Sequence, residues 1–389
     1  MPTRACEGVA GEFGVYVHIP FCTSRCDYCA FATWTGKSAL VEPYVAACIT
    51  EIRRAREAAP WRPATTVYVG GGTPSLLSPA QLTRLLDAIE RAPGAEVTVE
   101  ANPESTTGEF LRAARAAGVT RISLGVQSLV TRVLADLGRR HSPGSVGRAV
   151  GLVGEAGFAT YNVDVVYGSV AEQNEDLAAT IDGLLALDPA PPHVSAYALT
   201  VEPGTPLAAD PARHPDDDTE ADRYELVDEM LGAAGLDCYE ISNWARPGHE
   251  CRHNLACWRG ADYLGFGCAA HSHVAGHRFA NVTSPGRYID RIRDGVPAVA
   301  MSEHLDPAAR ELESLQLALR TRDGVPAAAL PDSDELAGLV ERRQGRAVLT
   351  RRGRLLANEV AIRLQPPPGT AGGPGGAAVG RACARAAGG

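Results

Sequence analysis

The 389-residue sequence lacks an uninterrupted apolar run of the length that a transmembrane helix needs. Its N-terminus also lacks the continuous apolar region of a secretory signal peptide. Positive charge is not in excess either, because 37 lysines and arginines stand against 46 aspartates and glutamates, a formal net charge of −9. An acidic chain is a poor candidate for a protein that works mainly by binding phosphate backbones. We therefore expect a cytoplasmic protein with no transmembrane segment and no nucleic-acid partner.

The composition is that of a folded protein, with 45% apolar and 21% charged residues. The length exceeds what one hydrophobic core usually supports, so we expect a large domain and a smaller one. A tail of proline, glycine and alanine without periodicity predicts disorder. The predicted division is a short lead at 1–13, a main domain at 14–245, a following segment at 246–300, a small and mostly helical domain at 301–364, and the tail at 365–389.

Short β-branched runs alternate with helical stretches in the first half of the chain. This alternation predicts parallel βα units, which close into a barrel or form an open doubly wound sheet. Polar residues follow the strand ends, where parallel barrels place their working face. The six predicted strands cover residues 15–19, 65–70, 96–102, 121–127, 160–168 and 193–200.

A fourth cysteine is missing from the stretch HIPFCTSRCDYCAF, which carries Cys22, Cys26 and Cys29 and ends at Phe31. A zinc site is one interpretation, but structural zinc is usually closed by four ligands. A redox pair fits the spacing of CDYC but leaves Cys22 unexplained, and chance is the third interpretation. Three thiolates in a loop directly after a strand suit a [4Fe–4S] cluster better. Three protein ligands would leave one iron open to an exogenous ligand.

The spacing C-x-x-x-C-x-x-C after the first strand, with the aromatic Tyr28 before the third cysteine, resembles the radical S-adenosylmethionine (SAM) superfamily. The resemblance implies an α/β fold with a partial (β/α)6 TIM-like barrel. It also implies that the open iron of the cluster is chelated by SAM. A second match is the glycine loop at 70–73 (GGGT), because the corresponding loop of the superfamily receives the SAM amino group. Glycines suit this role since they let backbone groups approach a ligand closely.

Five further stretches, VHIPFC, GGGTPS, VEANPE, SLGVQS and YNVDVVYG, resemble one subgroup of that superfamily. The subgroup contains the oxygen-independent coproporphyrinogen III dehydrogenase and the HemW heme chaperones, and the resemblance covers about residues 14–362. It implies that SAM is contacted by Tyr16, Tyr28, Gly71, Gly72, Thr73, Glu100, Gln127, Arg139 and Asp164.

Two features favour the chaperone within this subgroup. Phe31 stands where the dehydrogenase carries a fourth cysteine, and a phenylalanine can neither ligate iron nor cycle between redox states. The stretch HNLACW at 253–258 resembles a chaperone motif that is linked to heme handling, although Cys257 replaces the usual tyrosine. The resemblance therefore predicts heme as bound cargo, with His253 or Cys257 as its ligand. A turn histidine and a core aromatic remain the alternative explanation of this segment.

The predicted function is that of a heme chaperone that carries a [4Fe–4S] cluster and SAM and delivers heme to hemoproteins. The recipients that this resemblance suggests are membrane-associated respiratory proteins, and a homodimer is an open alternative to a monomer. The alternative function is an oxygen-independent coproporphyrinogen III dehydrogenase, and a radical methyltransferase or cyclopropanase is a third class. Whether the chain catalyses a reaction stays open. One loop, YGSVAEQ at 167–173, departs from the YGLPGQ that is usual in the subgroup.

Overall fold

The computed structural model describes residues 11–366. The predicted N-terminal lead up to residue 10 and the predicted disordered tail from residue 367 lie outside the described residues. None of the helices in the described range combines the length and the apolar character that crossing a membrane requires.

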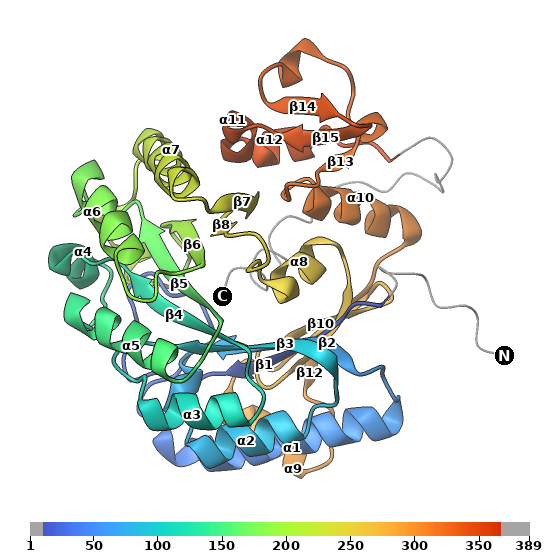
Figure 1. The fold of residues 1–389 in the computed structure, drawn as a ribbon. Coiled ribbons are helices and arrows are strands. Elements are labelled where there is room, and N and C mark those ends of the chain that lie inside the picture. The colour runs from blue at the N-terminus through green and yellow to red at the C-terminus, as the bar shows by residue number, and fades with distance from the viewer. Residues whose placement is uncertain (1–10, 367–389) are drawn as a thin grey trace.

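Six parallel strands form the centre of the molecule, and all six strands predicted from the sequence are present (Figure 1). They lie side by side in the order in which they occur in the chain, each parallel to the next. This arrangement confirms the predicted partial (β/α)6 barrel. The strands are β1 (Phe13–Ile19), β2 (Ala64–Gly71), β3 (Arg91–Ala101), β4 (Arg121–Gln127), β5 (Thr160–Tyr167) and β6 (His193–Ala198).

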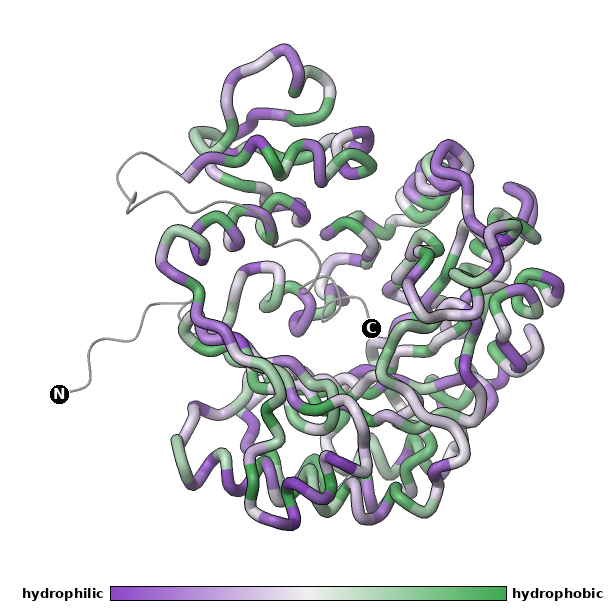
Figure 2. Tube along the Cα trace, turned by 180° about the vertical axis from the view of Figure 1, so that it is seen from behind, coloured by the Kyte–Doolittle hydropathy of each residue, from purple (hydrophilic) through white to green (hydrophobic). Residues whose placement is uncertain are grey.

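Helices connect the strands and cover the outer face of the sheet (Figure 1). Several begin at side-chain caps; Ser78 and Gln81, for example, form a capping box at the start of the second helix. Hydrophilic and hydrophobic residues alternate along these helices (Figure 2), as expected where one face is buried. The helices are α1 (Val41–Ala58), α2 (Pro79–Asp87), α3 (Gly108–Ala116), α4 (Thr131–Asp136), α5 (Pro143–Glu155), α6 (Asn174–Leu185) and α7 (Asp217–Ala233).

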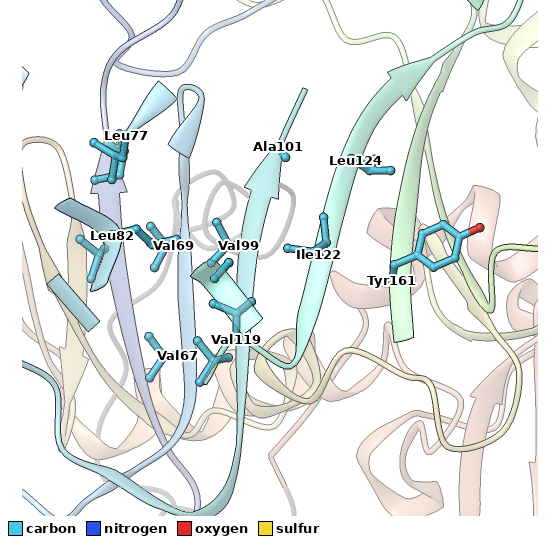
Figure 3. Packing of buried hydrophobic residues seen from close by; sticks show 14 of the residues in the cluster. Val67, Val69, Leu77, Leu82, Val99, Ala101, Val119, Ile122, Leu124 and Tyr161 are labelled. Carbon is cyan, nitrogen blue, oxygen red and sulfur yellow. The ribbon is translucent and has the colours of Figure 1, made fainter. Parts of the chain in front are cut away.

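The two faces of the central strands differ in chemistry. Valine, isoleucine and leucine side chains point outward and form the main core with the helices, as Val69, Val99 and Ile122 do in Figure 3. The inner face carries buried polar side chains at the alternating positions, among them Thr66, Thr98, Ser123, Asn162 and Ser195. Since a barrel interior is usually filled by branched apolar residues, this polar lining marks the interior as more than a packing layer.

The sheet continues beyond the six strands at both edges, to a total of twelve strands. One extension lies beside β1 and the other beside β6, and residue 301, a predicted domain boundary, falls inside β12. The added strands are β9 (Asp262–Phe266), β10 (His271–Val274), β11 (His277–Asn281) and β12 (Val299–His304) on one side, and β8 (Asn243–Ala245) and β7 (Asp237–Glu240) on the other. The helices of this part are α8 (Arg252–Trp258) and α9 (Pro285–Arg293).

The C-terminal unit has its own small hydrophobic core. Helices hold most of its regular structure, as predicted, but a three-stranded antiparallel sheet that the sequence did not predict lies beside them. Two of the strands form a hairpin whose turn residues, Gln344 and Gly345, both have positive φ. A Gln-Gly turn lacks the Asn-Gly or Asp-Gly signature that identifies such hairpins in a sequence. The elements are α10 (Pro307–Ala318), β13 (Val325–Pro326), β14 (Val340–Arg343), β15 (Arg346–Leu349), α11 (Arg351–Leu355) and α12 (Ala357–Ala361).

Candidate functional site

The three clustered cysteines lie in the loop that follows β1, and none of them forms a disulfide. The loop is held against the next segment of the chain, since the amide of Cys22 donates to the carbonyl of Trp34 at 3.1 Å. Within the loop, the Cys29 amide donates to the Cys26 carbonyl at 3.2 Å. Among the residues that the structure describes, no three Cys, His, Asp or Glu side chains are gathered as ligands of a single metal ion.

A pocket with a cavity volume of about 110 Å³ lies at the carboxyl ends of the parallel strands. The three cysteines line it together with residues of β2, β3, β4 and β5 and of the loops after β2, β3 and β4, so the strand order brings these distant segments together. Polar groups from several strand ends converge in it, as is typical of a small-molecule or cofactor site. Eight of the nine residues predicted to contact SAM line the pocket: Tyr28, Gly71, Gly72, Thr73, Glu100, Gln127, Arg139 and Asp164.

The glycine loop at the end of β2 leaves no space for side chains. A Cβ atom on Gly72 would lie 2.7 Å from the carbonyl oxygen of Ile19. Gly71 has a φ of +111°, and its amide donates to Glu100 Oε2 at 2.9 Å. Glycine is therefore required here both by conformation and by the close approach of neighbouring backbone.

Two buried carboxyl groups form the floor of the pocket. Glu100 accepts a second hydrogen bond from the Tyr68 hydroxyl at 2.9 Å. Asp164 accepts one from the side-chain nitrogen Nδ2 of Asn162 at 2.6 Å. Burial raises the pKa of Glu100 to about 7, and the nearby Asp164 adds to this effect. Burial likewise raises the pKa of Asp164 to about 6. A pair of buried carboxyl groups favours a ligand that brings positive charge.

Arg139 and Gln127 carry buried polar atoms without a partner in the described chain, Arg139 Nε and Gln127 Oε1. One Arg139 nitrogen lies 3.6 Å from the Cys26 sulfur, and another donates to the Gly125 carbonyl at 2.6 Å. Gln127 has a φ of +67°, which is unusual for a residue other than glycine and typical of functional sites. The unpartnered polar atoms of Arg139 and Gln127 fit the binding of a polar ligand. The three free thiols and the close-packed glycine loop fit an iron–sulfur cluster beside that ligand.

The sequence comparisons agree with this geometry. A model described as "Radical SAM superfamily" matches residues 16–182. The heme chaperone HemW of Mycobacterium tuberculosis is 45% identical over 370 residues, which cover 90% of this chain and 94% of that relative. The chain belongs to the HemW family of radical SAM proteins. HemW of Bacillus subtilis is 34% identical, over 89% of this chain and 97% of its own.

The fold of this HemW-family chain also has a counterpart among solved structures. Coproporphyrinogen III oxidase (HemN) from Escherichia coli, described as a radical SAM enzyme, superposes with a TM-score of 0.77 over 90% of this chain and 89% of its own. The two sequences are only 22% identical, so this likeness shows the fold alone. Phe31, which stands where the resemblance to the dehydrogenase predicts a cysteine, lines the pocket beside the cysteines.

Tyr16 is the one predicted SAM residue that does not line the pocket. Its hydroxyl group lies 3.0 Å from His18 Nδ1, and its ring stacks on Tyr68 with the centroids 6.3 Å apart. Because Tyr68 donates a hydrogen bond to Glu100, Tyr16 is connected to the pocket through the ring of Tyr68. Direct contact between Tyr16 and SAM stays a prediction.

The residues predicted as heme ligands lie elsewhere, on α8, which closes the barrel from the side of the C-terminal unit (Figure 1). His253 is only 3% exposed; its Nδ1 lies 2.9 Å from Thr66 Oγ1, and burial lowers its pKa to about 4. Its amide donates to Glu96 at 3.0 Å. Cys257 packs with Trp258 in a small apolar cluster. Heme ligation by either residue stays a prediction, and in this conformation both are buried.

Sequence reasoning missed several residues that line the pocket. Asn102, which donates to Thr73 Oγ1 at 3.1 Å, follows Glu100 closely and was within reach of the strand-end argument. Arg25 and Arg140 lie at the mouth, where nothing in the sequence pattern marked them. Ser24, Thr33, Ala101, Glu104, Ser123 and Gly125 complete the lining.

Proposed function

We propose that this chain binds heme and delivers it to hemoproteins. The observation that carries the proposal is the 45% identity, over nine-tenths of both chains, to a relative named as a heme chaperone. Phe31 supports the same conclusion, because it occupies the pocket wall where the dehydrogenase resemblance would require a cysteine.

Cys22, Cys26 and Cys29 would hold the [4Fe–4S] cluster, and the pocket beside them would hold SAM. When bound, the cluster supplies an iron with an open coordination position and an electron for SAM chemistry. Arg139 places a positive charge 3.6 Å from the Cys26 sulfur, which complements the negative charge of a thiolate-held cluster. Glu100 and Asp164 would orient the positively charged parts of SAM, and Gly72 would allow the close approach of its polar end.

The heme site is proposed on α8, where His253 or Cys257 supplies the ligand. Because both side chains are buried, heme ligation requires α8 to shift away from β2. The hydrogen bond between His253 and Thr66 would break in that movement. The proposed recipients are membrane-associated respiratory hemoproteins, and the protein is proposed to act in the cytoplasm.

Heme titration and product analysis test this function. The full chain is reconstituted anaerobically with iron and sulfide, and heme binding is followed by absorption spectroscopy. Separately, coproporphyrinogen III, SAM and a reductant are added, and the products are separated by chromatography. We expect stoichiometric heme binding and no protoporphyrinogen. Protoporphyrinogen formed over multiple turnovers, with no heme binding, would establish the dehydrogenase instead.

A further inference from the structure

Asp27 lies inside the cysteine motif, between Cys26 and Tyr28, and every polar group it offers is engaged by another part of the chain. Its amide donates to the Leu137 carbonyl at 3.2 Å, and its carbonyl accepts from the Leu207 amide at 3.0 Å. Its carboxylate accepts from Arg213 Nη1 at 2.9 Å. The cluster-binding loop is therefore attached to two segments that are more than 100 residues away in sequence.

Arg213 joins this loop to α4. It ends a short 3-10 helix (Pro211–Arg213), and its Nε donates to Asp136 Oδ1 at 3.1 Å while its Nη2 donates to the Asp136 carbonyl. The side chain of Arg213 is 22% exposed and that of Asp136 17%, so water screens these contacts less than it screens surface ion pairs. A planar guanidinium with several donors suits such a bridge between two acidic side chains.

The departure from the usual YGLPGQ loop supplies the next contact. Ser169 is fully buried, and its hydroxyl donates to Asp136 Oδ2 at 2.6 Å. Its carbonyl accepts from Arg223 at 3.2 Å, which holds the loop itself in place. Ser169 thereby completes a network with Asp27, Arg213 and Asp136.

Close packing accompanies these polar contacts. Tyr28 packs on an apolar cluster that includes Val133, Leu199 and Leu207. A Cβ atom on Gly138 would lie 2.7 Å from Asp27 Oδ1, so the chain at this position is pressed directly against the motif. The loop between Cys26 and Cys29 is thus docked on its outer side, while its thiols face the pocket.

We propose that Arg213 is a positioning residue for the cluster. The network of Asp27, Arg213, Asp136 and Ser169, which we call the Arg213 clamp, holds the loop that carries Cys26 and Cys29 in its binding conformation before iron arrives. The proposal rests on the proposed cluster function. Its physical basis is that a loop ordered in advance does not lose conformational entropy when it binds its ligand.

Thiol reactivity of the cluster-free full chain tests the clamp without a cofactor. Iodoacetamide is added anaerobically, and alkylation of the tryptic peptide from Cys26 to Lys37 is followed by mass spectrometry. We expect Arg213→Gln to raise the alkylation rate of this peptide on the order of tenfold, since charged hydrogen bonds are lost. Arg213→Lys should have an intermediate alkylation rate, because an ammonium group keeps the positive charge but lacks the planar set of donors of the guanidinium.

Two controls separate positioning from general loosening. Arg84→Gln removes a guanidinium from α2, where it pairs with Glu42 on α1 and not with the loop. Cys238, in β7, reports within each variant on the rest of the fold. In the control variant, the peptide from Cys26 to Lys37 should be alkylated at the wild-type rate. Cys238 should be alkylated at the wild-type rate in every variant. Asp27→Asn combined with Arg213→Gln should react no faster than Arg213→Gln alone, because the two residues act through one contact.

Reconstitution provides the second measurement. Iron per chain and the electron paramagnetic resonance spectrum of the reduced cluster should both change in Arg213→Gln and be partly restored in Arg213→Lys. Equal alkylation of wild type and Arg213→Gln, or an equal rise at Cys238, would overturn the clamp. A wild-type chain that holds no iron would instead overturn the proposed cluster function, and the alkylation rates would still decide the clamp.

Discussion

At the scale of single residues, the pocket combines groups whose ordinary chemistry is changed by burial. Glu100 and Asp164 both have raised pKa values, about 7 and about 6, because burial deprives their charged forms of water, and the charge of Asp164 raises the pKa of Glu100 further. Between the ordinary carboxyl pKa and these values, the folded chain binds more protons than the unfolded chain. Its free energy of unfolding therefore falls as the pH rises through this range.

The pH dependence of stability tests this account. Glu100→Gln in the cluster-free chain should flatten the fall in the free energy of unfolding between about pH 5 and 7.5, by on the order of 2 kcal/mol. Urea unfolding at several pH values measures the difference, and Glu57→Gln, which changes an exposed carboxyl on α1, is the control. Parallel curves for wild type and Glu100→Gln would show that Glu100 ionises freely.

The cluster ligands allow an equally direct test. A variant with Cys22, Cys26 and Cys29 all replaced by alanine should hold no iron or sulfide after anaerobic reconstitution, since no other cysteine lines the pocket in the described chain. Cys238→Ala should load like the wild type. Iron and sulfide retained by the triple variant would place the cluster elsewhere.

At the scale of elements, the αβ alternation made the sequence informative. β-branched runs mark most of the parallel strands, and β3, β4 and β5 carry a polar residue near their ends, so strand-end reasoning located Glu100, Gln127 and Asp164 on one face. The short strands β10 and β14 have no such signal, because four residues show too little periodicity. The contact of Asp27 with Arg213 spans 186 positions and left no pattern in the sequence.

The helix α8 shows a second limit of sequence reasoning. The sequence HNLACW predicted chemistry at His253 but not its burial, which depends on β2 and on α10 packing from opposite sides. Thr66, on the polar inner face of the barrel, forms a hydrogen bond with the imidazole of this histidine. What reads as a ligand motif is, in this conformation, also a structural contact.

Absorption spectra of heme-loaded variants test whether α8 supplies a heme ligand or only a packing contact. If His253 is the ligand, His253→Ala should change the heme spectrum and weaken binding, and Cys257→Ala should change neither. Thr66→Val, which removes only the hydrogen bond that holds the imidazole in the barrel, should favour the open position of α8 and strengthen heme binding. Wild-type affinity and spectra in all of these variants would mean that α8 supplies no ligand and has a packing role.

At the scale of the whole molecule, the twelve-stranded sheet places the cluster pocket and α8 at different parts of one barrel. The pocket floor and α8 are nevertheless connected, since Tyr68 donates to Glu100 and its ring lies 5.3 Å from that of His253. A chaperone needs to hold its cargo and release it to a chosen partner. The fold thus offers a connection between cofactor state and the proposed heme site.

The most direct test of the account measures heme delivery. The heme-loaded, cluster-containing chain is mixed with rising concentrations of a detergent-solubilised apo b-type cytochrome, and in parallel with apomyoglobin as a scavenger that reports spontaneous release. The account predicts that transfer to the cytochrome is faster than to the scavenger and rises with cytochrome concentration, because the chain hands heme over in a complex. Transfer at the spontaneous release rate to both acceptors, at every concentration, would contradict it.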